Sequence, residues 1–456
     1  MIVKLLLINA VDKTRSVQTY LPPLGLGYLV SSLRKKYGKK VIKCKIIDDE
    51  IEKEIKKFKP NIVGIRSVSQ TYQIAKKHAA TVKKYNLPVI MGGVHITALP
   101  QTLTADMDVG VLGEGEATII DLIDHYLKRK RFTSGQLKNI KGIVFRKNDK
   151  LIITPSRQLI TPLDSIPLPA RDLLAITNPT YMFTSRGCPY RCTFCASSRF
   201  WKKVRFFSAQ YVVKEIKYLY RHYQVDQIDF WDDLFIADRK RLEEIYVLLN
   251  KEGLLGKISF GCAVRSNLVD EQLAQLLQKM NFKRVSMGLE SASPRILKYL
   301  KGETISVANH TNAIKLLKQY HIDPSASFII GSPQETKKEI LKTLNFIKKS
   351  QLRGFSINLL TPYPGTPVWD YAQDRGLVND KMDWDILDID FEYNHQKAII
   401  LSEKIKREEL YRLFTKFKHE QTRRLFIYGL QNPQRIPKYI FGEIKRRFLK
   451  SNLLNS

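Results

Sequence analysis

The sequence predicts an α/β protein in which two parallel-sheet domains are followed by a basic, mainly helical C-terminal region. Short β-branched runs alternate with amphipathic helical stretches over residues 1–128, and the same alternation returns over residues 176–375. The chain has 456 residues, which is enough for two or three domains with cores of their own. We expect a bridge at residues 129–175 and a separate tail at residues 376–456.

In the first domain the expected strands and helices follow one another strictly, which predicts a doubly wound, Rossmann-like parallel sheet. Ligands of such sheets bind in the loops beyond the carboxyl ends of the strands. These loops are glycine-rich here, at residues 22–27, 67–70, 92–95 and 113–116, so the backbone can approach a ligand closely. The expected strands are 2–8, 41–47, 62–65, 89–91 and 109–112, and the expected helices are 24–37, 51–58, 72–85 and 117–128.

The bridge is expected to carry no chemistry. Residues 143–154 predict a β-hairpin that turns at Asn148 and Asp149. Three prolines, Pro162, Pro167 and Pro169, then stiffen the passage into the second domain.

Three of the five cysteines lie within eight residues, at Cys188, Cys192 and Cys195. Gly187 and Pro189 keep this segment out of a regular helix. Thiolates hold iron-sulfur clusters, and three of them leave one iron of a cubane open to a substrate. The alternatives are buried structural cysteines, which would not need this dense spacing, and a zinc site, which would need a fourth ligand nearby. The remaining Cys44 and Cys262 stand alone, so we expect a single cluster.

The second domain predicts a partial (β/α)6 barrel whose strands end in polar residues. Its expected strands are 181–184, 227–231, 258–263, 284–288, 325–330 and 354–360. As in a full barrel, functional residues should lie at the carboxyl ends of these strands. The strand ends carry Asp232 and Asp233, then residues 265–267, 288–291 and 330–333.

The cysteine spacing C-x3-C-x2-C, with Phe194 before the last cysteine, resembles the signature of the radical S-adenosylmethionine (SAM) superfamily. The segments PPLGLGYL, GGVH and GEGE resemble the cobalamin-binding domain that precedes many radical SAM domains. The resemblance covers residues 1 to about 375. It implies three cofactors: a 4Fe-4S cluster held by the three cysteines, SAM, and cobalamin.

The resemblance also implies which residues bind the two larger cofactors. WDD stands where the family has a glycine-rich GGE, yet a carboxylate there still suits the amino group of SAM. The expected SAM-binding residues are Phe194, Asp232, Asp233, Arg265, Glu290, Gly331 and Pro333. The expected cobalamin-binding residues are Pro23, Leu24, Ser67, Ser69, Gly92, Gly93, Gly113 and Glu114. The PYPGTP segment at residues 362–367 is expected to line the substrate side.

One departure from the family pattern concerns the cobalt. The first domain has no D-x-H-x-x-G segment, whose histidine supplies the lower axial ligand where it is present, so we expect cobalamin without a histidine ligand. His95 is either a neighbour of the cobalt or a structural histidine with satisfied hydrogen bonds. A Rossmann-like sheet that has lost its cofactor site is the alternative for the whole domain.

The resemblance implies that the open iron chelates SAM and that one electron cleaves it to methionine and a 5'-deoxyadenosyl radical, which takes hydrogen from the substrate. The leading hypothesis is a cobalamin-dependent radical SAM C-methyltransferase acting on an unactivated carbon. A rearrangement or cyclisation enzyme is the alternative within the family, and a non-catalytic iron-sulfur protein for nucleic-acid binding or electron transfer is the alternative outside it. A tRNA methylthiotransferase would need three more cysteines in the first domain, where only Cys44 occurs.

The net charge of +32 favours an anionic partner, although a solvated lysine-rich surface would give the same value. From Glu403 onward, 14 Lys or Arg stand against 5 Asp or Glu. A basic amphipathic helix with apolar positions Ile436, Ile440, Ile444 and Phe448 could lie on an anionic membrane or dock on the barrel. Without a signal peptide or a membrane-length apolar run, we expect a cytoplasmic protein, at most peripheral to the membrane. Expected partners are a small-molecule or lipid-like substrate and an external one-electron donor such as flavodoxin or ferredoxin, but not nucleic acid.

Overall fold

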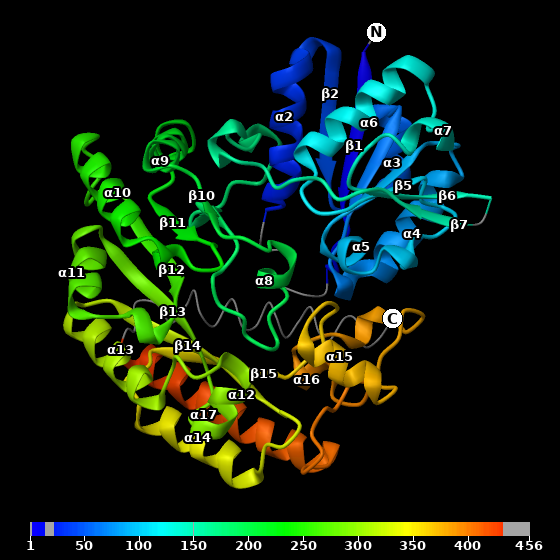
Figure 1. Cartoon of the computed structure of the whole chain (residues 1–456). Coiled ribbons are helices and arrows are strands. Elements are labelled where there is room, and N and C mark those ends of the chain that lie inside the picture. The colour runs from blue at the N-terminus through cyan, green and yellow to red at the C-terminus, as the bar shows by residue number, and fades with distance from the viewer. Residues whose placement is uncertain (1, 14–21, 149, 432–456) are drawn as a thin grey trace.

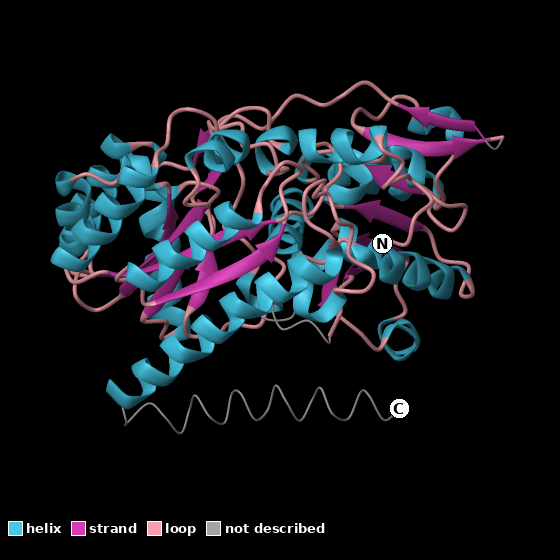
Figure 2. Ribbon diagram, turned by 90° about the horizontal axis from the view of Figure 1, so that it is seen from below, coloured by secondary structure: helices cyan, strands magenta, loops and turns pink. Residues whose placement is uncertain are grey.

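The computed structural model describes residues 2–13, 22–148 and 150–431, and it confirms the predicted α/β class. Two sheets, the first mainly parallel and the second wholly parallel, form separate bodies that lie side by side, the first in blue and cyan and the second mainly in green and yellow (Figure 1). The cysteine loop and the short helix α8 (Ser197–Phe200) lie between them. Figure 2 shows the same two sheets from below, with helices on their outer faces.

The first sheet has the strand order β2-β1-β3-β4-β5-β6-β7 and is parallel from β2 to β5. Parallel strands are buried on both faces and therefore read as continuous apolar runs, as Leu5, Leu6 and Leu7 do at 0–2% exposure. The strands are β1 (Val3–Asn9), β2 (Ile42–Ile47), β3 (Ile62–Arg66), β4 (Val89–Gly92) and β5 (Val109–Val111). The helices are α2 (Leu24–Val41), α3 (Ile51–Phe58), α4 (Tyr72–Lys83), α5 (Val94–Ala98), α6 (Glu116–Arg129) and α7 (Ser134–Leu137).

The chain reverses its winding between β1 and β3, because β2 pairs on one side of β1 and β3 on the other. In open α/β sheets a crevice forms at such a switch point, beyond the carboxyl ends of the strands. Three of the four loops predicted to bind a cofactor follow β3, β4 and β5 and lie at that edge, while the fourth, at residues 22–27, runs into α2. The predicted hairpin forms as β6 (Ile143–Lys147) and β7 (Lys150–Ile153), and β6 pairs antiparallel with β5, so the hairpin extends the first sheet.

The second sheet is the predicted six-stranded partial barrel, in the order β15-β14-β13-β12-β11-β8 with every pair parallel. Its strands are β8 (Thr180–Met182), β11 (Gln227–Phe230), β12 (Ser259–Val264), β13 (Phe282–Glu290), β14 (Asp323–Ile330) and β15 (Gly354–Leu359). The helices between them are α9 (Ala209–Tyr223), α10 (Arg239–Lys251), α11 (Glu271–Lys279), α12 (Pro294–Lys301), α13 (Val307–Gln319) and α14 (Lys337–Lys349). Side-chain caps fix several helix starts, as Asp270 does for α11.

The first domain touches the barrel at both edges of the open sheet. After β8, the short ribbon of β9 (Ser185–Arg186) and β10 (Arg205–Phe206) forms ion pairs with the loop after β5. After β15, Tyr363 accepts a hydrogen bond of 2.7 Å from Gln70, in the loop after β3. The two domains also share an apolar cluster in which Met91 packs with Leu360 and Trp384. The first domain therefore spans the open side of the partial barrel.

The C-terminal region docks on the barrel as far as the structure describes it. After α15 (Pro367–Asp374) and α16 (Phe391–Asn394), the helix α17 (Arg407–Gln431) runs along the edge strand β15. Gln421 donates a hydrogen bond of 2.6 Å to the carbonyl of Phe355, and Arg424 one of 2.6 Å to that of Leu352. The amphipathic segment predicted at residues 436–448 lies outside the described residues. Within the described part of the chain, no helix is long and apolar enough to cross a membrane.

Candidate functional site

The three clustered cysteines lie on the loop that leaves β8, and all three thiols are free and half-buried. Gly187 allows the loop to start, because its φ of +96° is a left-handed conformation and a Cβ there would lie 2.8 Å from the carbonyl of Lys203. The loop is pinned at its far side, where the amide of Thr193 donates 3.0 Å to the carbonyl of Leu300 at the end of α12. The predicted SAM contact Phe194 packs against the apolar cluster shared by the two domains.

The surroundings of the thiols fit an iron-sulfur cluster. Backbone amides point at two of the sulfurs, from Tyr190 to Cys188 and from Ser197 to Cys195. Arg265 donates from Nη1 to the Cys192 sulfur at 3.5 Å. Such donors stabilise thiolates, the form in which cysteine binds iron.

Burial by itself favours the neutral thiol. It raises the pKa of Cys188 to about 11, so a bound metal would have to displace the proton. Among the residues the structure describes, no three His, Cys, Asp or Glu side chains converge on a single ion. The ligands of a cubane bind separate irons, so a cluster does not require its cysteines to converge on one ion.

The two acidic residues after β11 have different environments. Asp232 is buried, and its carboxylate accepts from the amide and hydroxyl of Thr184 at 2.7 and 2.8 Å and from the hydroxyl of Ser185 at 2.7 Å. It therefore fastens β11 to the start of the cysteine loop. Asp233 is exposed as a whole residue, but its Oδ2 accepts from the Gly187 amide at 3.1 Å. Burial of its carboxyl group raises its pKa, and it acts electrostatically on Cys188 and Cys195, so of the two predicted SAM contacts Asp233 is the one beside the cysteines.

Arg265 connects the end of β12 with the cysteine loop. Its guanidinium lies over the ring of Tyr190, 3.9 Å from the centroid, and donates to the carbonyl of Lys301 at 3.0 Å as well as to the Cys192 sulfur. The side chain is 4% exposed, so its position is fixed by these partners. The predicted SAM residue thus contacts the predicted cluster loop directly.

Glu290 ends β13 in a strained conformation. Its φ is +63°, and the register between β13 and β14 shifts at this point. Lys301 lies 3.6 Å from the carboxylate, and both side chains are almost fully buried. Burial raises the pKa of Glu290, while the charge of Lys301 opposes that shift. Backbone strain at a non-glycine residue is typical of functional sites, which suits the predicted SAM contact.

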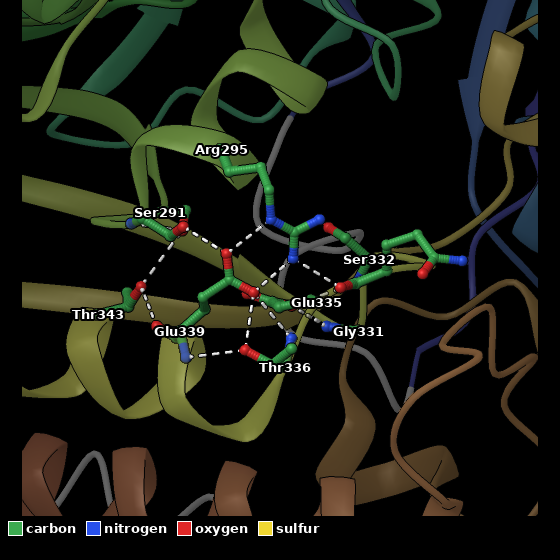
Figure 3. A network of polar contacts seen from close by, with 10 residues as sticks. Ser291, Arg295, Gly331, Ser332, Glu335, Thr336, Glu339 and Thr343 are labelled. Carbon is green, nitrogen blue, oxygen red and sulfur yellow. Dashed lines mark hydrogen bonds and ion pairs between the residues drawn. The ribbon is translucent and has the colours of Figure 1, made fainter.

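The loop after β14 is held by a buried carboxyl group (Figure 3). Gly331 has a φ of +87°, and its amide donates to Glu335 Oε2 at 2.8 Å, as does the amide of Ser332 at 3.2 Å. Glu335 is fully buried, and its second oxygen has no partner among the described residues. Pro333 is buried beside them, and its carbonyl accepts from the amide of Glu403 at 2.7 Å.

Glu339, in the first turn of α14, has the opposite environment. It accepts from the guanidinium of Arg295 at 2.6 Å and from the hydroxyl of Thr336 at 2.8 Å (Figure 3). These partners lower its pKa to about 2, although burial acts in the other direction. Glu339 is therefore ionised at neutral pH, and it ties α12 to the start of α14.

At the edge of the first sheet, the loops after β3 and β4 pack closely. A Cβ on Gly93 would lie 2.3 Å from the carbonyl of Ser67, so only glycine fits there, whereas a Cβ on Gly92 or Gly113 would meet nothing within 4 Å. The hydroxyl of Ser67 is buried and has no partner within the described ranges. An open glycine edge and an orphaned hydroxyl fit a ligand with many amide groups, such as cobalamin.

His95 is a structural residue. Its ring nitrogens contact the hydroxyls of Ser69 at 3.1 Å and Thr102 at 3.2 Å, and its ring stacks on Tyr72 with centroids 3.8 Å apart. Burial lowers its pKa to about 3, so it stays neutral. Both ring nitrogens of His95 therefore have protein partners, and the absence of a histidine ligand to the cobalt stays a prediction.

Three predicted cobalamin contacts have protein partners in the structure. Ser69 bonds to His95, Leu24 is buried in the core cluster of the barrel, and Glu114 accepts from Arg186 at 2.5 Å and Arg205 at 2.9 Å. Pro23 is half-buried at the start of α2. Cofactor contact by all four remains a prediction.

Sequence reasoning missed Arg186, Glu335 and Lys301. The only local signals were the position of Arg186 two residues before Cys188 and the position of Glu335 four residues after Gly331.

Comparisons with known proteins show the family and the fold of the chain. The model of the radical SAM superfamily matches residues 182–347, and that of the B12 binding domain matches residues 12–123. An uncharacterized methyltransferase of Pyrococcus horikoshii is 36% identical over 380 residues, which are 80% of this chain and 81% of that protein. The anaerobic magnesium-protoporphyrin IX monomethyl ester cyclase of Cereibacter sphaeroides is 26% identical over 386 residues, 79% of this chain and 61% of the cyclase.

Among solved structures, the chain is similar to the radical SAM methyltransferase TsrM of Kitasatospora setae, determined with cobalamin and a 4Fe-4S cluster bound. The TM-score is 0.67 at 17% identity, over 82% of this chain and 75% of that chain. At this identity the likeness shows the fold.

Proposed function

The chain belongs to the radical SAM superfamily, in the group with an N-terminal B12-binding domain, and from this premise we propose that it is a C-methyltransferase for an unactivated carbon of a small-molecule or lipid-like substrate. The radical SAM domain implies a 4Fe-4S cluster and SAM, and the B12-binding domain implies cobalamin. One observation carries the proposal: the cysteine loop touches the carboxyl edge of the first sheet, through Arg186 and Glu114.

When bound, the cluster would supply the electron that cleaves SAM and cobalamin would supply the methyl carrier, while the protein orients the reactants and excludes water. Cys188, Cys192 and Cys195 would hold the cluster. Asp233, which lies beside them, is suited to accept hydrogen bonds from the amino group of SAM. Glu290 would accept from the ribose hydroxyls.

The loop at residues 331–333 would meet the adenine through its backbone. Glu335 accepts hydrogen bonds from the amides of Gly331 and Ser332, so these two amides would not be available to the adenine. On the other side of the reaction space, Gly92 and Gly113 leave room for the cobalamin at the edge of the first sheet.

The enzymatic part of the proposal is tested with anaerobically reconstituted protein, SAM and dithionite. Release of 5'-deoxyadenosine is expected, and its absence with a fully loaded cluster contradicts the proposal. Cobalamin binding is tested separately, by the visible spectrum after loading with hydroxocobalamin and desalting. A colourless protein would contradict that part alone.

A cyclisation or rearrangement without methyl transfer is the second candidate, favoured by the similarity to the cyclase of C. sphaeroides. Methyl transfer from SAM releases S-adenosylhomocysteine in addition to 5'-deoxyadenosine, whereas cyclisation alone does not. Quantifying both products with candidate substrates therefore separates the two reactions.

We also propose that an acidic one-electron carrier such as flavodoxin or ferredoxin reduces the cluster, that the protein is cytoplasmic, and that its basic C-terminus contacts anionic membranes peripherally. The charge of +32 supports an anionic partner. Co-sedimentation with anionic liposomes, comparing the full chain with one that ends near Asn432, tests the membrane contact. Equal binding of the two chains would exclude the last segment as the anchor.

A further inference from the structure

The cluster loop and the loop after β5 of the first domain are joined by a four-residue ion-pair group. Arg186 donates from Nη1 to Glu114 at 2.5 Å and from Nη2 to Glu116. Arg205, the cross-strand neighbour of Arg186, donates to the other oxygen of Glu114 at 2.9 Å. The group holds two positive and two negative charges and is therefore neutral as a whole.

The group is almost fully removed from solvent. The side chains of Arg186, Glu114 and Glu116 are 9%, 4% and 8% exposed. The rings of Tyr28 and Trp201 also flank the guanidinium of Arg186, at 5.7 and 5.3 Å from its centre. A planar guanidinium that is bonded to two carboxylates and flanked by two rings has very little freedom to move.

Buried ion pairs are a poor source of stability, because desolvation offsets most of the attraction between the charges. They do impose geometry, since each donor must meet one acceptor. Here the ion pairs set the position of the cluster loop relative to the loop after β5. Arg186 lies two residues before Cys188, and Glu114 and Glu116 belong to the Gly-Glu-Gly-Glu loop at the carboxyl edge of β5, where the cobalamin is expected.

We propose that Arg186 is a positioning residue that fixes the separation between the iron-sulfur cluster and the cobalt, by locking the cluster loop to the loop after β5. The inference rests on the proposed function, because it requires both cofactors. The other contacts between the domains, at Gln70–Tyr363 and around Trp384, hold the opposite edge of the barrel. Loss of the ion pairs of Arg186 should therefore shift the two loops relative to each other without separating the domains.

The test is the double variant Arg186→Met with Glu116→Gln, which removes one charge of each sign and leaves the Glu114–Arg205 pair in place. The matched control is Asp172→Asn, which breaks the 2.7 Å ion pair with Arg34 on α2, outside both cofactor loops. Each protein is loaded with cluster and cobalamin, and its iron and cobalt contents are measured first.

The readout is the magnetic coupling between the reduced cluster and cob(II)alamin, measured by pulsed electron paramagnetic resonance. Both centres are paramagnetic, and their dipolar coupling falls with the cube of their distance. We expect one narrow coupling in the wild type and in Asp172→Asn, and a weaker, broader one in the double variant at unchanged iron and cobalt content. An unchanged coupling overturns the inference, even where the melting temperature falls.

If the double variant does not retain both cofactors, the single variant Arg186→Lys takes its place, because it keeps the charge of the group but loses the planar fork that bonds two carboxylates at once. The coupling must then change in the same direction by a smaller amount, and an unchanged coupling again overturns the inference. A wild type that binds no cobalamin would overturn the proposed function together with this inference. A normal wild type with unaltered variants would overturn the inference alone.

Discussion

The buried Glu335 gives a prediction whose size follows from the structure. Its carboxyl group accepts two backbone hydrogen bonds, but burial outweighs them and raises the pKa from 4.5 to about 8. The group is therefore protonated in the folded protein at neutral pH and ionised in the unfolded chain. Replacing Glu335 by Gln keeps the oxygen that accepts from Gly331 and Ser332 and removes the ionisation.

The direction of the pH dependence of stability follows from the number of protons bound in the folded and unfolded states. Between pH 4.5 and about 8 the folded state holds a proton that the unfolded state has released, so the free energy of unfolding falls as the pH rises. Each pH unit in this window costs about 1.4 kcal/mol, which amounts to about 3 kcal/mol at pH 7. Glu335→Gln should be more stable than the wild type by about that amount at pH 7 and equally stable near pH 4.5.

The assay is urea denaturation of both proteins at several pH values between 4.5 and 8. Glu339→Gln, four residues further on in the first turn of α14, serves as the control, because this carboxylate has a pKa lowered to about 2 and accepts from Arg295 and Thr336. Its replacement should destabilise the protein by about 1 to 3 kcal/mol at pH 7. A Glu335→Gln curve parallel to the wild-type curve across this pH range would refute the reasoning.

Three further predictions concern the cofactors. Cys192→Ala should lose the iron-sulfur absorbance and all SAM cleavage while still binding cobalamin, whereas Cys44→Ala should keep both, as iron analysis and a cobalamin titration will show. Arg265→Met should lower the reduction potential of the cluster, because a cationic donor to the Cys192 sulfur is lost. The expected change is roughly 60 mV, the equivalent of about 1.4 kcal/mol for one electron. A redox titration in which Arg265→Met matches the wild type would contradict this. His95→Leu should cost about 1 to 3 kcal/mol of unfolding free energy, since the hydroxyls of Ser69 and Thr102 lose their partner, yet leave the cob(II)alamin resonance spectrum unchanged. A changed spectrum would make His95 a neighbour of the cobalt.

The elements were predictable from the sequence because hydrophobic periodicity is local. The expected helix at residues 51–58 is α3 with identical ends, and the expected strand at 325–330 lies within β14. The hairpin was predicted too, but not its place in the first sheet. That place depends on β6 pairing with β5 across more than thirty residues of chain, and periodicity carries no signal for such a pairing.

The candidate site was predictable where a strand end positions a residue, and not where distant segments meet. Arg265 follows β12 and lies against the cysteine loop, as the order of the strands indicated. Glu114 also follows a strand, yet its carboxylate forms ion pairs with Arg186 and Arg205 of the second domain. Leu24 lies in a segment predicted to contact the cofactor, but its side chain packs into the core of the barrel. Which domain it packs against depends on the tertiary structure and cannot be read from the local sequence.

The contacts of the first domain with both edges of the six-stranded sheet have a consequence for the lifetime of the bound cofactor. A domain attached at one edge could swing aside on a hinge and release what lies beneath it. Here the ribbon after β8 holds one side and the loop after β15 holds the other, so release requires both attachments to break at once. If cobalamin binds between the two domains, as proposed above, it should therefore dissociate slowly and serve many catalytic cycles before it exchanges.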